Sequence, residues 1–305
     1  MNLIQNRLKM NINNKLLEKV LGYKTKIKIS CDGLGLSSDQ NRKNLLGFLD
    51  SNAFQMQLKN NSSIIAVFVT EQLKGLVDLG GKTLLSCEDP RHSYYTLHNY
   101  IGKKSYIKKK SVIHRSSKIS KKASISNYNV EIGKGVEIEP NATILPDVVI
   151  GDNCIIRAGA VLGTVGFEHK RTSKGILSVF HDGKVILYEN VEVGANSCID
   201  KGFSFRHTIV GEGTKIDDLV YVAHSVHIGS NCLIVANATI MGSVEIKDNV
   251  WIGPSSTIAP QVTIENGGYI TLGSVVTKNV LENQCVTGNF AIPHDKFIAH
   301  LKKLI

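Results

Sequence analysis

The stretch KIDDLVYVAHSVHIGSNCLIVANATIMGSVEIKDNVWIGPSSTI, residues 215–258, places an aliphatic side chain at every sixth position. The same period holds without a break over a longer segment, at Val210, Ile216, Val222, Ile228, Ile234, Ile240, Ile246, Ile252, Ile258, Ile264, Ile270 and Val276. Small or compact side chains follow four residues later, at Thr214, Val220, Val226, Cys232, Ala238, Val244, Val250, Ser256, Val262, Gly268, Ser274 and Val280. A period of six fits neither an α-helix nor an alternating strand, but it fits a β-solenoid with one short strand and one turn per repeat.

The repeat also extends toward the N-terminus. It runs through Ile113, Ile119 and Ile125, slips by one residue, and continues at Ile132, Ile138, Ile144, Ile150, Ile156 and Leu162. It resumes at Leu187, Val193, Ile199 and Phe205, and slips again before Val210. We expect three repeats to close one triangular coil, with the large aliphatic side chains inside, and we expect the slips to be bulges or corners.

Residues 163–184 interrupt the repeat and cannot form one more coil. We expect an inserted loop that leaves the solenoid. Long loops on a rigid scaffold are commonly functional, although a tolerated surface insertion explains the same pattern.

Residues 1–105 lack the period of six and contain apolar runs such as SIIAVFVT at 63–70. They predict a small α/β domain. Residues 289–305 predict a short C-terminal helix. The expected fold is therefore mainly β: a parallel β-helix over 106–288 with its inserted loop, a small domain in front and a helix behind.

Composition narrows the classes of protein. No run of about 18 apolar residues occurs, and charged residues interrupt the N-terminal segment, so we expect a soluble cytoplasmic protein. The six cysteines are scattered without a CxxC pair, which predicts reduced, packed thiols and no metal site.

The formal net charge is +10, and nine Lys or Arg residues with no acid lie between residues 101 and 125. Such a run is usually a solvated face. The alternative is a surface for an anionic partner, namely an acidic carrier protein, a nucleotide diphosphate or a membrane. Nucleic acid is not expected as a partner, because Tyr106 is the only aromatic residue interleaved for base stacking.

Two phrases of the repeat region, VEVGANSCIDKG at 191–202 and KIDDLVYVAHSVHIGSNCLI at 215–234, narrow the field further. They resemble UDP-3-O-acylglucosamine N-acyltransferase of lipid A biosynthesis and related nucleotide amino-sugar N-acyltransferases of the hexapeptide-repeat superfamily. The front domain is similar too, in GFLDSNAF at 47–54, AVFV at 66–69 and GKTLL at 81–85. The resemblance implies a left-handed β-helix, a homotrimer, no permanently bound cofactor, and acyl-CoA or acyl carrier protein as co-substrate.

The resemblance makes His224, in the phrase VAH, the general base. The chemistry needs such a group, because an ammonium cannot attack a thioester until it loses a proton, and imidazole titrates near neutral pH. His224 comes two residues after an interior aliphatic, so we expect it at a corner, pointing outward. We expect a structural or supporting role for His227.

Further site residues follow from the same resemblance. Phe48 and Phe54 would stack on the base of a UDP-linked amino sugar, with Ser51 or Asn52 near the uracil edge, although aromatic residues beside a turn often pack in a core. Asp217 and Asp218 would lie near the sugar, and Gln261 stands where the family has a second histidine. Asn237 and Met241 would border and shorten the acyl channel, and Phe167 would help to cover it.

The main prediction is transfer of an acetyl or short hydroxyacyl group to the amino group of a UDP-linked amino sugar for surface polysaccharide. The alternative is true UDP-3-O-(3-hydroxyacyl)glucosamine N-acylation for lipid A. A zinc carbonic anhydrase is less expected, because His207, His224 and His227 have a poor spacing for a shared metal. A non-catalytic solenoid would need no base.

Overall fold

The computed structural model describes residues 11–39, 42–288, 291 and 293–303. Contacts divide the chain into two units. We call residues 1–107, 167–182 and 203–205 the N-terminal unit, and residues 108–166, 183–202 and 206–305 the β-helix unit. The expected division near residue 105 is therefore incomplete, because two short segments from the repeat region belong to the first unit.

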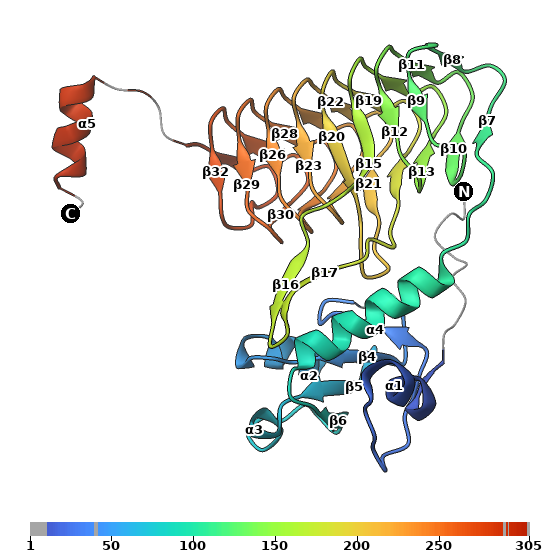
Figure 1. The fold of residues 1–305 in the computed structure, drawn as a ribbon. Coiled ribbons are helices and arrows are strands. Elements are labelled where there is room, and N and C mark those ends of the chain that lie inside the picture. Colours follow the sequence, from blue (N-terminus) through green and yellow to red (C-terminus); the bar gives the residue numbers. More distant parts are fainter. Residues whose placement is uncertain (1–10, 40–41, 289–290, 292, 304–305) are drawn as a thin grey trace. The chain divides into compact units, whose positions relative to one another are not determined.

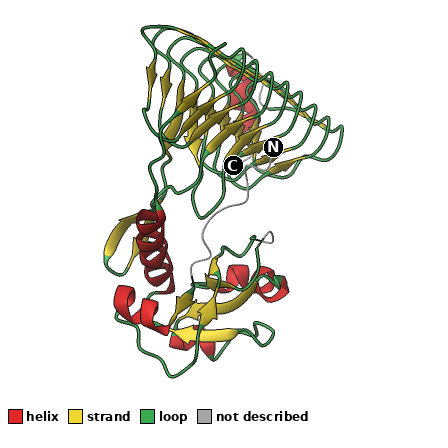
Figure 2. Cartoon of the chain, turned by 90° about the vertical axis from the view of Figure 1, so that its right-hand side faces the viewer, coloured by secondary structure: helices red, strands yellow, loops and turns green. Residues whose placement is uncertain are grey.

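The β-helix unit is built from three parallel sheets, seen as stacked rows of strands in Figure 2. The first sheet contains β7 (Val112–Ile113), β10 (Val130–Ile132), β13 (Val148–Ile150), β18 (Val185–Leu187), β21 (Thr208–Val210), β24 (His227–Ile228), β27 (Glu245–Ile246) and β30 (Thr263–Ile264). The second contains β8 (Lys118–Ile119), β11 (Glu137–Ile138), β14 (Ile155–Ile156), β19 (Glu192–Val193), β22 (Lys215–Ile216), β25 (Leu233–Ile234), β28 (Trp251–Ile252), β31 (Tyr269–Ile270) and β33 (Cys285–Val286). The third contains β9 (Ser124–Ile125), β12 (Thr143–Ile144), β15 (Val161–Val165), β20 (Cys198–Lys201), β23 (Tyr221–Val222), β26 (Thr239–Ile240), β29 (Thr257–Ile258) and β32 (Val275–Val276).

The interior of the coils contains the residues that the period selects. All twelve aliphatic residues from Val210 to Val276 belong to one buried cluster. The residues four positions later are buried as well. The predicted fold class, mainly β and built on a parallel β-helix, is confirmed.

The corners of the coils share one backbone conformation. Ser225, Asn231, Asn237, Ser243 and Asn249 all have positive φ, between 55° and 62°. Asparagine tolerates the left-handed region better than most residues, which explains why it recurs at the corners. Gly229 has a different reason: a Cβ there would lie 2.4 Å from Oδ1 of Asp248 in the next coil.

The N-terminal unit contains a four-stranded parallel sheet of β3 (Gly33–Leu34), β4 (Leu45–Phe48), β5 (Ile64–Val69) and β6 (Thr83–Ser86). An antiparallel pair, β1 (Ile12–Asn13) and β2 (Ser30–Cys31), lies apart from it. Its helices are α1 (Asn14–Leu21), the short 3₁₀ turn η1 (Asn52–Phe54), α2 (Gln55–Asn60), α3 (Glu71–Lys74) and α4 (Pro90–Ser105). Asp89 caps α4 by accepting from His92 N at 2.8 Å, and Pro90 follows at the first helical position.

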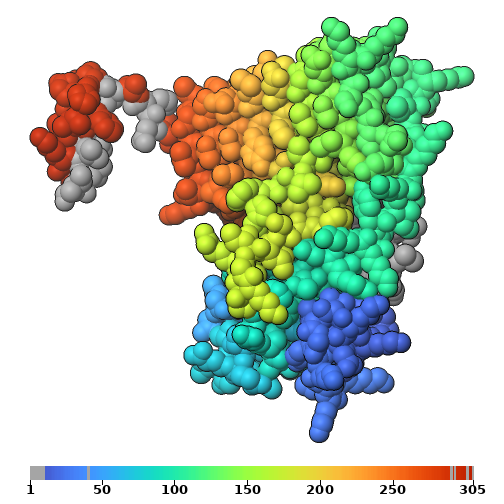
Figure 3. All heavy atoms as spheres, viewed as in Figure 1, coloured from blue at the N-terminus to red at the C-terminus, as the bar shows by residue number. Residues whose placement is uncertain are grey.

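The inserted segment is not a free loop. It forms an antiparallel hairpin of β16 (His169–Thr172) and β17 (Gly175–Ser178), which packs on α4 (Figure 3). Asn99 of α4 donates to the Ser178 carbonyl at 2.8 Å and accepts from Phe180 N at 2.7 Å. The hairpin is therefore hydrogen-bonded into the N-terminal unit.

Phe205 corrects one assignment of the repeat. We expected it inside the coils, but it packs partly buried against the core of the N-terminal unit, with Arg42 4.5 Å above its ring. Ser204 and Phe205 both have positive φ, which turns the chain away from the coil at this slip. At the C-terminal end, the described helix α5 is His294–Leu301 (Figure 1), and residues 289–290, 292 and 304–305 of the predicted segment lie outside the described residues.

Candidate active site

His224 lies at the corner that follows β23. Val222 and Val226, on either side of it, both belong to the buried interior, whereas His224 is partly exposed and does not. Ser225 forms the left-handed turn, and its N–H donates to Thr208 Oγ1 at 2.9 Å. The chain at this corner is thus fixed by a buried hydrogen bond, and the imidazole is on the outer side of the coil.

Two glycines border the imidazole. A Cβ on Gly242, at the same corner of the next coil, would lie 2.4 Å from Cε1 and 2.7 Å from Nε2 of His224. A Cβ on Gly166, which follows β15, would lie 3.0 Å from Cδ2. The ring therefore occupies a slot between two backbone segments, and a residue larger than glycine at position 166 or 242 would collide with it.

Asp200 is an acidic residue beside this slot. The same Cβ position on Gly166 lies 3.0 Å from Oδ2 of Asp200, so Asp200 and His224 flank one glycine. The carboxylate accepts from the hydroxyl of Tyr221 at 2.6 Å and from the hydroxyl of Thr164. Asp200 is only 3% exposed, and this burial raises its pKa, although the two hydroxyl donors lower it.

Tyr221 stays protonated for a matching reason. Burial raises the pKa of its phenol, and its hydrogen bond to Asp200 raises it further. The hydroxyl therefore serves as a hydrogen-bond donor to Asp200 at neutral pH. Sequence reasoning missed this pair, although Asp200 sits in the phrase CIDKG, where a charged residue directly follows an interior isoleucine.

Two other predicted residues share the corner of His224. Gln261 is at the same corner two coils further on, and its N–H donates to the Gly242 carbonyl at 3.1 Å. Met241 directly precedes Gly242 and is 36% exposed. The structure therefore brings together His224, Met241 and Gln261.

Asp217, Asp218 and Asn237 lie at a different corner, the one that follows the second sheet. Asp218 Oδ1 accepts from Ala195 N, and Asp217 Oδ2 accepts from Ala236 N at 3.1 Å. Both carboxylates thus tie the turns of adjacent coils together. Asn237 donates its backbone N–H to the Asp218 carbonyl at 3.0 Å. Within one chain, these three residues are not at the corner of His224.

The predicted nucleotide-binding residues all lie in the N-terminal unit. Phe48 ends β4, and its half-buried ring packs 4.8 Å from Tyr94 and 5.6 Å from Tyr95. Phe54 ends η1 and is 45% exposed. Ser51 and Asn52 are exposed on the same turn. Phe167, the predicted cover of the acyl channel, belongs to the N-terminal unit and is exposed.

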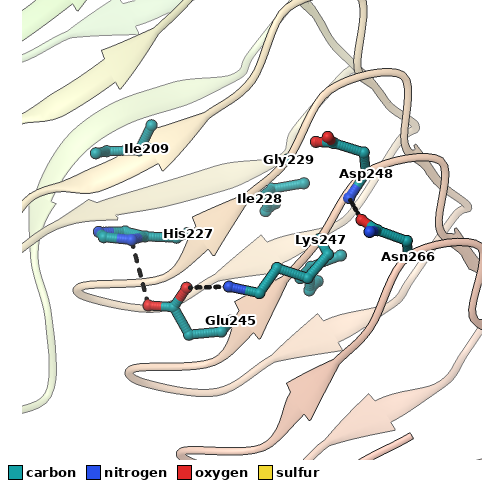
Figure 4. Close-up of a pocket in the computed structure, with 9 residues that line it drawn as sticks. Ile209, His227, Ile228, Gly229, Glu245, Lys247, Asp248 and Asn266 are labelled. Carbon is teal, nitrogen blue, oxygen red and sulfur yellow. Dashed lines mark hydrogen bonds and ion pairs between the residues drawn. The ribbon is translucent and has the colours of Figure 1, made fainter. Parts of the chain in front are cut away.

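His227 faces outward from β24 toward acidic and basic neighbours (Figure 4). Its Nδ1 lies 3.2 Å from Glu245 Oε1, and Lys247 Nζ lies 3.6 Å from the other carboxylate oxygen. His207, in turn, accepts from Lys184 N at 3.1 Å. Within the described part of the chain, no group of three or more His, Cys, Asp or Glu residues could hold a metal ion.

None of the described helices has the length and apolar character needed to cross a membrane.

Comparison with known proteins identifies the repeat. The model of the bacterial transferase hexapeptide (six repeats) matches residues 129–164 and 207–242. A UDP-3-O-acylglucosamine N-acyltransferase of Caulobacter vibrioides (strain NA1000 / CB15N) is 48% identical over 88 residues, which cover 29% of this chain and 26% of the relative. The enzyme of that name from Methylobacterium nodulans is 51% identical over 88 residues, which cover 29% of this chain and 25% of the relative. The chain thus spans about a quarter of the length of these curated relatives.

Solved structures give a weaker likeness. The Arabidopsis UDP-N-acetylglucosamine acyltransferase is 20% identical with a TM-score of 0.47, covering 58% of this chain and 69% of its own. The UDP-N-acetylglucosamine acyltransferase from Campylobacter jejuni is 20% identical with a TM-score of 0.42, and the match covers 63% of this chain and 82% of that structure.

Proposed function

We propose that this chain, which carries the six-residue repeats of bacterial hexapeptide transferases, is an N-acyltransferase that acylates the amino group of a UDP-linked amino sugar. One observation carries the proposal. His224 stands at an outer corner, in a slot between Gly166 and Gly242, and the buried Asp200 lies beside Gly166 as well.

The residues of this corner suit acyl transfer from a thioester. Nε2 of His224 removes a proton from the acceptor amine while the amine nitrogen attacks the carbonyl carbon of the thioester. The tetrahedral intermediate then collapses, the C–S bond breaks, and the proton taken from the amine passes from the imidazolium to the leaving thiolate. No net proton is left on the enzyme.

Asp200 supports this cycle electrostatically. The imidazolium exists only while the tetrahedral intermediate does, and a nearby carboxylate favours the charged ring. Tyr221 and Thr164 fix the carboxylate by donating to it, so it needs no rearrangement when the positive charge forms. Asp200 is therefore a positioning and charge-stabilising residue.

Of the two substrates considered from the sequence, the name of the curated relatives favours the alternative. We therefore propose a UDP-3-O-acylglucosamine as acceptor and a long-chain hydroxyacyl carrier protein as donor, in place of the short acyl group of the main prediction. That main prediction rested in part on Gln261 in place of a histidine, and in part on the bulk of Asn237 and Met241. Asn237 is at another corner than His224, whereas Met241 directly precedes Gly242, which lies against the imidazole.

The test is a matrix of donors and acceptors with the purified full chain. UDP-3-O-acylglucosamine with a 3-hydroxyacyl carrier protein should give the N-acylated product, detected by mass spectrometry. UDP-amino sugars with acetyl-CoA should give none. Turnover of the short-chain pair alone would restore the main prediction, and turnover of neither pair would overturn the proposed reaction.

We further propose a homotrimer, with substrates bound in grooves between neighbouring chains. The outer side of the second sheet supports it, because Leu233, Trp251 and Tyr269 lie side by side on adjacent strands. Leu233 and Tyr269 are 43% and 44% exposed, and the rings of Trp251 and Tyr269 stack with centroids 5.7 Å apart. An apolar row of this kind is typical of a protein interface. Light scattering should give three chains per particle, and a monomer would contradict the assembly.

A further inference from the structure

The first coil of the β-helix, residues 108–125, carries a charge that the active site does not use. It contains Lys108, Lys109, Lys110, Arg115, Lys118, Lys121 and Lys122, and it contains no Asp or Glu. All seven side chains are exposed. They begin before β7, pass one corner, continue on β8 and end at the next corner. The charge therefore spreads around the rim of the coil.

The same coil forms one end of the stack (Figure 1). Strands β7, β8 and β9 are each the last strand of their sheet. As a result, a residue at an interior position is uncovered: Ile113 is 44% exposed, whereas Ile132, its neighbour in the next coil, is 4% exposed. Val112, next to Ile113, is 65% exposed. The end of the prism thus presents apolar side chains bordered by basic ones.

This combination favours one kind of partner. A flat anionic lipid surface needs no pocket; it attracts lysines around a rim through its surface potential, and exposed aliphatic side chains can enter the headgroup region. An acidic carrier protein would instead require basic residues gathered on one patch of matching shape. We propose that the first coil docks end-on against an anionic membrane surface, through its lysines and through Val112 and Ile113.

A purely structural explanation of the lysines makes different predictions. Exposed edge strands invite pairing with other chains, and lysine on an edge prevents it. On that explanation the protein would not bind lipid vesicles, and loss of the lysines would cause the chains to self-associate. Vesicle binding separates the two explanations.

The experiment measures co-sedimentation of the purified full chain with vesicles. We expect binding to vesicles of phosphatidylcholine with phosphatidylglycerol, and none to pure phosphatidylcholine. Binding should weaken as salt rises from about 0.1 M to about 1 M, because the Debye length falls from about 10 Å to about 3 Å. The triple variant Lys108→Gln/Lys109→Gln/Lys110→Gln should lose most of it, measured as at least a tenfold lower bound fraction.

Matched variants make the result specific. Lys215→Gln/Lys247→Gln/Lys278→Gln removes the same charge from other coils and should bind as the parent chain does. Lys121→Gln/Lys122→Gln, at another corner of the first coil, should reduce binding even if the first triple variant fails to fold. Val112→Ser should reduce the binding that remains at high salt.

Three outcomes would overturn the proposal. They are no binding of the parent chain to anionic vesicles, equal losses in both triple variants, and a first-coil variant that keeps vesicle binding but loses binding to an acidic carrier protein. None of these readouts depends on the acyl transfer reaction. The membrane-docking proposal can therefore fail while the proposed reaction holds, and the reverse.

Discussion

Gly242 lies directly against the imidazole of His224: a Cβ at Gly242 would be 2.4 Å from Cε1 and 2.7 Å from Nε2. Contacts this short between carbon atoms do not occur without movement. The absence of a side chain at residue 242 is therefore a condition for the ring position in this structure.

Gly242→Ala should displace the imidazole and lower turnover with little loss of acceptor binding. A shift of about 1 Å at a reacting group can cost on the order of 10²-fold in rate. Steady-state kinetics would measure it. Gly75→Ala is the control, because its Cβ would meet only Gln72 O, at 3.8 Å. Turnover of Gly242→Ala equal to that of the control would show that the ring position does not matter.

Phe54→Ala should weaken binding of the sugar nucleotide by about 1 to 3 kcal/mol if the ring stacks on the base. Phe54 is half exposed, so the variant should keep its thermal stability. Phe48→Ala should lose both binding and stability, because Phe48 also packs against Tyr94 and Tyr95. Calorimetric titration with UDP, alongside melting curves, separates the two effects. Unchanged UDP affinity in both variants would contradict the stacking role.

Asp200→Asn should change the pH dependence of stability. Burial raises the pKa of Asp200 above the value of about 3.9 expected in an unfolded chain, so the folded state holds the proton more tightly. Its contribution to stability is complete below the unfolded pKa and is lost as pH rises through the folded one. The amide never ionises. The melting temperature of the variant, relative to the parent chain, should therefore rise between pH of about 4 and about 8; a constant difference would contradict a raised pKa.

Cys285 should be the first thiol to react with an aromatic disulfide reagent in the native protein. All six cysteines are free, and Cys285 is exposed, whereas Cys154 and Cys232 point into the coils. Burial raises the pKa of the Cys154 thiol to about 11, which leaves little reactive thiolate at neutral pH. Cys285→Ser should remove the fast phase. A fast phase that persists in that variant would place an accessible thiol elsewhere.

The β-helix was predictable from sequence because every coil repeats the same steric requirement. From Val210 onward, each aliphatic residue of the period is buried. A shift of one residue would turn all of these side chains outward, so the hydrophobic pattern fixes the register of the coils. The position of His224 outside the interior follows from the same count. Its neighbours Val222 and Val226 occupy the two inward positions of the repeat.

The departures from the repeat were not predictable. Phe205 keeps the spacing of an interior residue, yet it packs in the N-terminal unit, because packing there outweighs the local pattern. The hairpin of β16 and β17 likewise joins α4 through hydrogen bonds between residues about 80 positions apart, such as Asn99 with Ser178. Asp200 was missed because it and its two partners, Thr164 and Tyr221, come from three different coils, and no local motif unites them.

The most direct test of the proposed chemistry is the single-turnover rate of His224→Ala, measured with His227→Ala as its control. Both substitutions remove an imidazole from the same stretch, but His227 faces Glu245 on the outer side of β24. His224→Ala should lower the rate by roughly 10²- to 10⁴-fold while acceptor binding is kept, and His227→Ala should keep the parent rate. Equal rates in both variants, or a larger loss in His227→Ala, would contradict the assignment of His224 as the base.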